Sequence, residues 1–246
     1  MGFMDRYKKT ETSRAEDICR YFATLFPDRE EMVYPEEVTD SVSVDVHIMM
    51  PNENQNFYVV YTVGMSDLPM TLPEKFAGQE DMKYAELYAF LPATWDWGES
   101  EGFSVEVDQQ GDWILRYMKY LAKFPHRNKT WIGYGHTIPN GPDYAPLCAG
   151  TEMGGVLISQ VGNELEAVNT RDGSIVNLFM VIPAYREEIE FGREYGIAAL
   201  NEVFGENQMT LVINMHRPNY CRWYSRVFAG TGLLSRYWGQ KPVYNL

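Results

Sequence analysis

The chain lacks several features that mark particular classes of protein. Its 246 residues include three cysteines, Cys19, Cys148 and Cys221, which are too widely spaced for a CxxC or CxH motif. No apolar run approaches the roughly 18 residues that a membrane-spanning helix needs. The first 17 residues contain no apolar stretch of the kind found in a secretory signal peptide. We therefore expect a cytoplasmic protein with reduced thiols and no membrane association.

Motifs for metal ions and nucleotides are also incomplete. The four histidines are well separated and form neither HxH nor HExxH, so their spacing gives no support for a metal site. Gly133 and Gly135, and the pair Gly154-Gly155, complete neither a GxGxxG motif nor a P-loop. The sequence therefore predicts no metal and no cofactor.

Basic residues are scarce. The chain has 21 Lys and Arg against 34 Asp and Glu, which gives a formal net charge of −13 at pH 7. Nucleic-acid-binding proteins gain much of their affinity from Lys and Arg that neutralise phosphates, so this balance argues against a nucleic-acid partner. The charge is unevenly distributed, because residues 210–246 carry five basic and no acidic side chains. An acidic body steers a basic partner toward it and also keeps a protein soluble, and both interpretations stay open.

Hydrophobic periodicity predicts three helices. The first begins at Ser13 with a capping-box pattern and ends before Pro27. Asp112 is a candidate cap for the second, which carries a wide aromatic stripe. The third follows Pro183 and is expected to continue to about Phe204.

Apolar segments of strand length separate these helices. They lie at residues 41–49, 57–63, 85–91, 154–160, 164–169, 175–182 and 209–214. The pattern predicts an α+β fold, with a mixed, largely antiparallel central sheet flanked by helices. Because no linker or repeat interrupts the chain, we predict a single domain over residues 1–246, with a core at about 13–220 and an aromatic, basic tail at 221–246.

Several segments, in order along the chain, resemble the motifs of one family. They are VDVH from Val44, TVGMSDLPM from Thr62, YAELYAFLPATW from Tyr84, GYGHTI with a following NG from Gly133, LFMVIPAYREEI from Leu178 and RPN from Arg217. Together they resemble the Suppressor of fused domain over roughly residues 42–220. That family occurs widely in bacteria and as the N-terminal half of an animal signalling regulator, whose second domain has no counterpart here.

The resemblance implies a non-catalytic domain that binds other proteins. It also implies a mixed sheet flanked by helices. Bacterial members are similar to immunity proteins of polymorphic toxin systems, which neutralise a toxin by covering it. Many such toxins are nucleases with basic clefts, so the resemblance and the acidic charge together predict another protein as partner, a basic toxin domain.

Five residues are candidates for partner binding: Asp67, Trp95, Trp97, Tyr134 and His136. Tryptophans beside loop residues often serve as binding anchors, and a histidine on a glycine-rich loop is a typical functional position. The structural alternatives stay open. Asp67 also suits a tight turn, the tryptophans also suit the core, and His136 also suits a hydrogen bond to its own loop.

Two other functions remain open. One is an enzyme with a cleft centred on His136 and assisted by Asp67 or Asp143, although the sequence around Ser66 is not GxSxG. The acidic residues at 187, 188 and 190 are interpreted as a solvated helix face instead of a catalytic carboxylate pair. The other is a scaffolding subunit in which residues 231–246 dock into a homodimer.

Overall fold

The computed structural model describes residues 13–36, 41–97 and 111–224. The chain forms two compact units. One comprises Met1–Gly133 and Gln160–Met180, and the other comprises Tyr134–Ser159 and Val181–Leu246, as far as these ranges are described. Because the chain crosses from one unit to the other three times, neither unit is a continuous segment. The single domain expected from the sequence stays a prediction.

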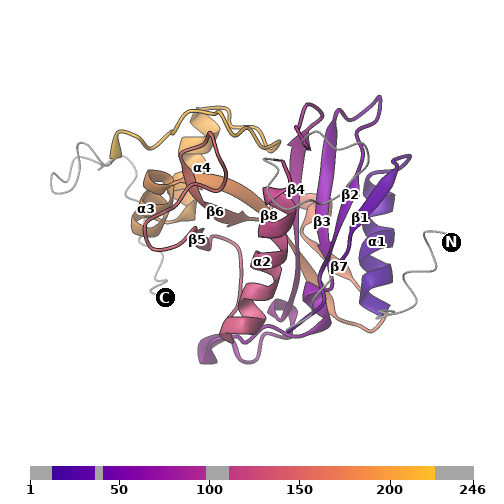
Figure 1. Ribbon diagram of the computed structural model, residues 1–246. Coiled ribbons are helices and arrows are strands. Elements are labelled where there is room, and N and C mark those ends of the chain that lie inside the picture. Colours follow the sequence, from indigo (N-terminus) through magenta and orange to yellow (C-terminus); the bar gives the residue numbers. More distant parts are fainter. Residues whose placement is uncertain (1–12, 37–40, 98–110, 225–246) are drawn as a thin grey trace. The chain divides into compact units, whose positions relative to one another are not determined.

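The described part of the first unit includes α1, α2, β1 to β4, β7 and β8 as far as Met180, all labelled in Figure 1. Its strands follow the hydrogen-bonded order β1-β2-β3-β4-β8, and β7 also pairs with β8. Their bounds are Glu31–Tyr34 (β1), Asp45–Met49 (β2), Phe57–Val63 (β3), Tyr84–Pro92 (β4), Ala167–Asn169 (β7) and Ile175–Tyr185 (β8). β4 and β8 run parallel, and the other pairs of neighbours run antiparallel.

Helix α1 (Ser13–Leu25) packs on β3 and β4. Its side chains Ile18 and Phe22 are fully buried, and the Phe22 ring stacks on Tyr61 with 4.0 Å between the centroids. The predicted helix end before Pro27 is confirmed. Aromatic side chains from both elements therefore form the core beneath this helix.

Helix α2 (Trp113–Asn128) also packs on the strands of the first unit. Its buried side chains include Ile114, Leu115, Met118, Leu121 and Ala122. The helix begins after Asp112 as predicted, but the Asp112 side chain does not cap it. That carboxylate pairs with Arg116 one turn later, with 2.6 Å between Oδ2 and Nη1.

The described part of the second unit contains two short strands, the end of β8 from Val181, and two helices. β5 (Thr137–Pro139) pairs antiparallel with β6 (Met153–Ser159), and β6 lies between β5 and β8 in the strand order. Helix α3 (Arg186–Tyr195) packs on β5 and β6 and is followed by α4 (Ile197–Glu206). The mixed, largely antiparallel sheet with flanking helices is thus confirmed.

The single helix expected after Pro183 is wrong. Pro183 lies inside β8, and two helices follow it, separated at Gly196. Gly196 has a φ of 89°, which is incompatible with a continuous α-helix. The apolar spacing continues across this break, so periodicity alone did not reveal it.

Two strand predictions differ from the structure, and two strands were not predicted. Residues 209–214 form no strand, and within this segment only Val212 has an isolated bridge. The segment 164–169 divides into a 3₁₀ turn, Asn163–Leu165, and the short strand β7. β1 and β5 were not predicted, since strands of four and three residues are too short to show alternation.

No helix within the described ranges is long and apolar enough to cross a membrane.

Candidate functional site

A fully buried carboxylate, that of Glu86 on β4, lies beside the turn that follows β3. Its Oε1 accepts hydrogen bonds from Gly64 N (3.0 Å), Ser66 N (2.9 Å) and Ser66 Oγ (2.7 Å). Its Oε2 accepts from the Thr62 hydroxyl at 2.6 Å. Burying a charge is costly unless it is hydrogen-bonded, and these four bonds offset part of that cost; burial still raises the pKa of Glu86 to about 7.

This cluster joins two of the motif segments, TVGMSDLPM and YAELYAFLPATW. Gly64 is required in the turn because its φ is 115°, and a Cβ there would lie 2.1 Å from Ser43 O. Glu86 was not among the site residues predicted from the sequence. The signal was an acidic residue within an otherwise apolar strand, a position where a buried carboxylate needs partners.

Two further side chains fix the same turn, the 3₁₀ element η3 (Met65–Asp67). Arg14 of α1 donates from Nη1 to Ser66 O at 2.8 Å, and His126 of α2 bonds Met65 O through Nε2 at 2.9 Å. Burial lowers the pKa of His126, although the bond to Met65 O opposes this shift. We name residues 64–69 the clamped turn, because β4, α1 and α2 all hold it in place.

The clamped turn places three of its residues at least partly at the surface. Asp67 is half-buried, Leu68 is 44% exposed and Pro69 is exposed. The structural alternative for Asp67, a residue in a tight turn, agrees with its position in η3. A role for Asp67 in partner binding stays a prediction.

A second buried carboxylate, Glu188 of α3, lies in the second unit. It forms a two-pronged ion pair with Arg217, with 2.5 Å from Nη1 to Oε1 and 2.6 Å from Nη2 to Oε2. Arg217 Nη2 also donates to Pro183 O at 3.0 Å, and the Tyr185 hydroxyl donates to Arg217 O at 2.6 Å. This cluster joins the LFMVIPAYREEI segment to RPN.

The solvated helix face expected at residues 187, 188 and 190 is therefore wrong for Glu188, which is 0% exposed. The RPN segment returns to the start of α3 and covers it, a long-range contact that helix periodicity does not encode. Glu187 accepts a hydrogen bond from Asn219, and Glu190 pairs with Arg186 one turn away.

The GYGHTI segment, residues 133–138, leads into β5 and includes its first two residues. Gly135 has a φ of 83°, and its N–H donates to Ile158 O at 2.8 Å. Ile158 N in turn donates to His136 O at 2.8 Å. Tyr134 is 46% exposed, and His136 is partly buried, which lowers its pKa. The loop is thus held by β6, and roles for Tyr134 and His136 in binding stay predictions.

Trp95 and Trp97 lie in the first unit after β4, and both are half-buried. Trp95 Nε1 donates to Gly111 O at 2.9 Å. The Trp95 ring contacts Trp97 and Trp113, with centroids 6.3 and 6.2 Å apart. The two tryptophans are therefore packed side by side, and their role as anchors for a partner stays a prediction.

Ring contacts continue from Trp113 along α2. The centroids are 6.2 Å apart for Trp113 and Tyr117, 5.8 Å for Tyr117 and Tyr120, and 6.2 Å for Tyr120 and Phe124. We name these four residues the aromatic stripe. Its most exposed member is Tyr120, at 46%.

The family model described as Suppressor of fused protein (SUFU) matches residues 40–218. The chain belongs to this family. Members of the SUFU family are known for binding other proteins. No curated protein matches the chain significantly.

Solved structures show the same fold. A SUFU (suppressor of fused protein) homologue from Neisseria gonorrhoeae FA 1090 has a TM-score of 0.60 and 13% identity, over 84% of this chain and 96% of that one. A chain of the Sufu-Fu complex has a TM-score of 0.61 and 14% identity, over 87% and 94%. Drosophila Suppressor of Fused has a TM-score of 0.55 and 12% identity, over 86% of this chain and 51% of that one. This SUFU-family chain thus spans about half of the Drosophila protein.

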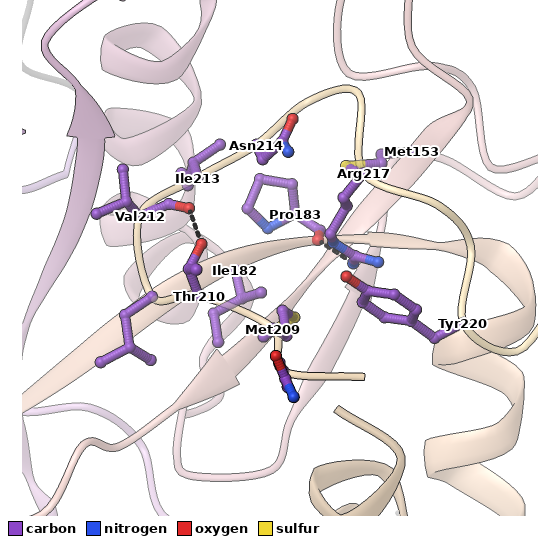
Figure 2. A pocket seen from close by; sticks show the side chains of 12 residues that line it. Met153, Ile182, Pro183, Met209, Thr210, Val212, Ile213, Asn214, Arg217 and Tyr220 are labelled. Carbon is purple, nitrogen blue, oxygen red and sulfur yellow. Dashed lines mark hydrogen bonds between the residues drawn. The ribbon is translucent and has the colours of Figure 1, made fainter. Parts of the chain in front are cut away.

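A cavity of about 200 Å³ lies in the second unit of this SUFU-family chain (Figure 2). It is lined by Met153, Ile182, Pro183, residues 208–214, Arg217 and Tyr220. The Arg217 guanidinium at its wall is already paired with Glu188. The cavity is smaller than the roughly 300–1,000 Å³ of a usual ligand pocket.

The residues of the enzyme alternative are distributed between the units. Asp67 belongs to the first unit, whereas His136 and Asp143 belong to the second, where Asp143 is exposed. Within the described ranges, no group of three or more His, Cys, Asp or Glu is placed to hold a metal ion. Burial raises the pKa of the Cys19 and Cys221 thiols to about 12, so neither is activated as a nucleophile.

Proposed function

We propose that this SUFU-family chain is a non-catalytic domain that binds another protein through its clamped turn. Membership of a family of protein-binding domains supports the binding of another protein and a non-catalytic role. The polar residues of the family motifs also support a non-catalytic role. Glu86, Glu188 and Arg217 are committed to hydrogen bonds inside their own units, where they stabilise the fold.

The structure of the clamped turn is the main support for the proposed binding site. Hydrogen bonds from β4, α1 and α2 hold its backbone, while Leu68 at its end is 44% exposed. A loop that is fixed before binding loses little conformational entropy when a partner covers it. Rigid elements that present an exposed loop are a common arrangement for binding sites.

The partner that best fits the charge is a basic protein, and we propose a toxin domain that the chain neutralises. The net charge of −13 attracts such a partner over long distances. Since salt screens this attraction, the association rate constant with the isolated partner should fall steeply as salt increases. An association rate that does not change with salt would contradict the proposed basic partner.

Substitution of Leu68 tests the proposed site. With the isolated partner, Leu68→Ser should raise the Kd at least about 10-fold, as expected when a central apolar contact is lost. Leu211→Ser is the matched control, because Leu211 is 42% exposed, close to Leu68, but belongs to the other unit. Equal affinities for the wild type and Leu68→Ser would show that the partner binds elsewhere.

A further inference from the structure

The cavity of the second unit has a largely apolar lining. It includes Met153, Ile182, Pro183 and Ile213, which are buried, and Met209, which is half-buried (Figure 2). Its volume of about 200 Å³ exceeds the roughly 150 Å³ of an engineered apolar cavity that binds benzene. Exposed residues within 208–214 also line it, so the cavity opens to solvent. A ligand the size of one aromatic ring can therefore enter and fit.

One wall of the cavity carries a hydrogen-bond donor that the fold leaves unused. Arg217 lines the cavity and is 7% exposed. Its Nη1 donates to Glu188 Oε1 and Pro218 O, and its Nη2 donates to Glu188 Oε2 and Pro183 O. A guanidinium has five N–H groups, and these four bonds use all but the one at Nε. Within the described ranges this Nε–H has no partner, so it can donate to an acceptor held in the cavity.

Three side chains of the lining favour an aromatic ligand over an aliphatic one. Met153 and Met209 both contribute thioether sulfurs, which make favourable contacts with the edges of aromatic rings. Tyr220 also lines the cavity, and its ring centroid lies 5.1 Å from the guanidinium carbon of Arg217. A ligand ring can pack on this phenol and on the guanidinium plane.

The buried ion pair sets the charge of the ligand. Among the described residues that line the cavity, Arg217 is the only charged one, and Glu188 already neutralises it through the two-pronged contact. A ligand carboxylate would have to share the guanidinium with a buried carboxylate, and a ligand ammonium group would be repelled by the guanidinium. An uncharged ligand avoids both costs.

We propose that this cavity binds one small, uncharged aromatic molecule whose carbonyl or hydroxyl oxygen accepts a hydrogen bond from Arg217 Nε. The ring then lies among Met153, Met209 and Tyr220. This site goes beyond the proposed function, because the cavity lies in the second unit and the clamped turn lies in the first. Loss of this ligand and loss of the protein partner are therefore measured with substitutions at different residues.

Methyl NMR of the methionines in the full chain tests the site, with acetophenone as the probe. Low millimolar acetophenone should shift the methyl signals of Met153 and Met209 until they saturate. It should leave the signal of Met65, which is buried in the first unit, in place.

A pair of tryptophan variants tests whether the probe occupies the cavity. Met209→Trp places a larger side chain in the lining and should abolish the saturable shift at Met153. Met215→Trp is the matched control, since Met215 is also half-buried in the second unit but does not line the cavity. A circular dichroism spectrum of each variant checks its folding.

Two further probes test the chemistry on the wild type. The Nε–H signal of Arg217 should move further downfield with acetophenone than with toluene, which has the ring but no acceptor. Benzoate should bind at least about 10-fold more weakly than acetophenone, because Glu188 already neutralises the guanidinium. Four results would overturn the proposal: no saturable shift at Met153 and Met209, an undiminished Met153 shift in folded Met209→Trp, an equal Nε–H response to acetophenone and toluene, or benzoate bound as tightly as acetophenone.

Discussion

Replacing Arg217 with methionine would leave the carboxylate of Glu188 buried without its cation. Arg217 is 7% exposed and Glu188 is 0% exposed, so the carboxylate would lose its cation inside the protein. The substitution removes both hydrogen bonds of the ion pair and the bond to Pro183 O. Removal of one partner from a buried pair costs about 3–5 kcal/mol.

The loss should be visible in thermal and chemical unfolding. For a chain of this size, each kcal/mol corresponds to roughly 2–4 °C in Tm, so Arg217→Met should lower Tm by roughly 6–20 °C. Arg217→Lys should recover only part of the loss, because one ammonium group cannot make the two-pronged contact. The double variant Glu188→Leu/Arg217→Met should also recover part of it, since no buried charge is then left unpaired.

An exposed ion pair of the same helix provides the control. Arg186 is 60% exposed and pairs with Glu190 one turn away. Arg186→Met should therefore change the free energy of unfolding by less than about 1 kcal/mol. The reasoning is refuted if Arg217→Met is as stable as Arg186→Met, because the buried pair would then contribute no more than a surface pair.

Three further predictions concern the first unit and the thiols. Burial raises the pKa of Glu86 to about 7, so the folded state holds this proton more tightly than the unfolded state does, and the contribution of Glu86 to the free energy of unfolding should fall as pH rises from about 4.5 to about 7. Burial lowers the pKa of His126 and His136, which contribute in the opposite direction, so the test compares two proteins: in denaturant titrations, the stability of the wild type relative to Glu86→Gln should fall over this range. Gly64→Ala should lower the free energy of unfolding by about 2–4 kcal/mol in the same assay, because a Cβ would lie 2.1 Å from Ser43 O at a φ of 115°. A decrease of less than about 1 kcal/mol would contradict the clash between this Cβ and Ser43 O. Burial raises the pKa of Cys19 and Cys221 to about 12, so both thiols should react slowly with a thiol reagent at neutral pH in the folded protein and rapidly after denaturation. Rapid labelling of either thiol in the folded protein would refute this prediction.

Local patterns in the sequence predicted local structure well. The capping box at Ser13 and the stop at Pro27 placed α1, and the run at residues 57–63 has the bounds of β3. These signals depend on neighbours in the sequence. Gly196 was misassigned because glycine also occurs inside helices, and only its φ shows that it separates two of them.

The polar clusters could not be predicted from local patterns. Glu86 bonds to residues more than 19 positions away, and Glu188 pairs with Arg217 across 29 positions. The family motifs identified the segments that form the clusters but not which of their atoms hydrogen-bond to one another. The relevant signals, an acid inside an apolar strand and an arginine before a proline, become interpretable only once the fold brings them together.

Affinity capture of the tagged full chain from its native lysate, followed by mass spectrometry, tests the central claim most directly. The wild type and Leu211→Ser should retain one protein in stoichiometric amount, and Leu68→Ser should lose it. The account is contradicted if no protein is retained at low salt, or if Leu68→Ser retains the same protein in the same amount.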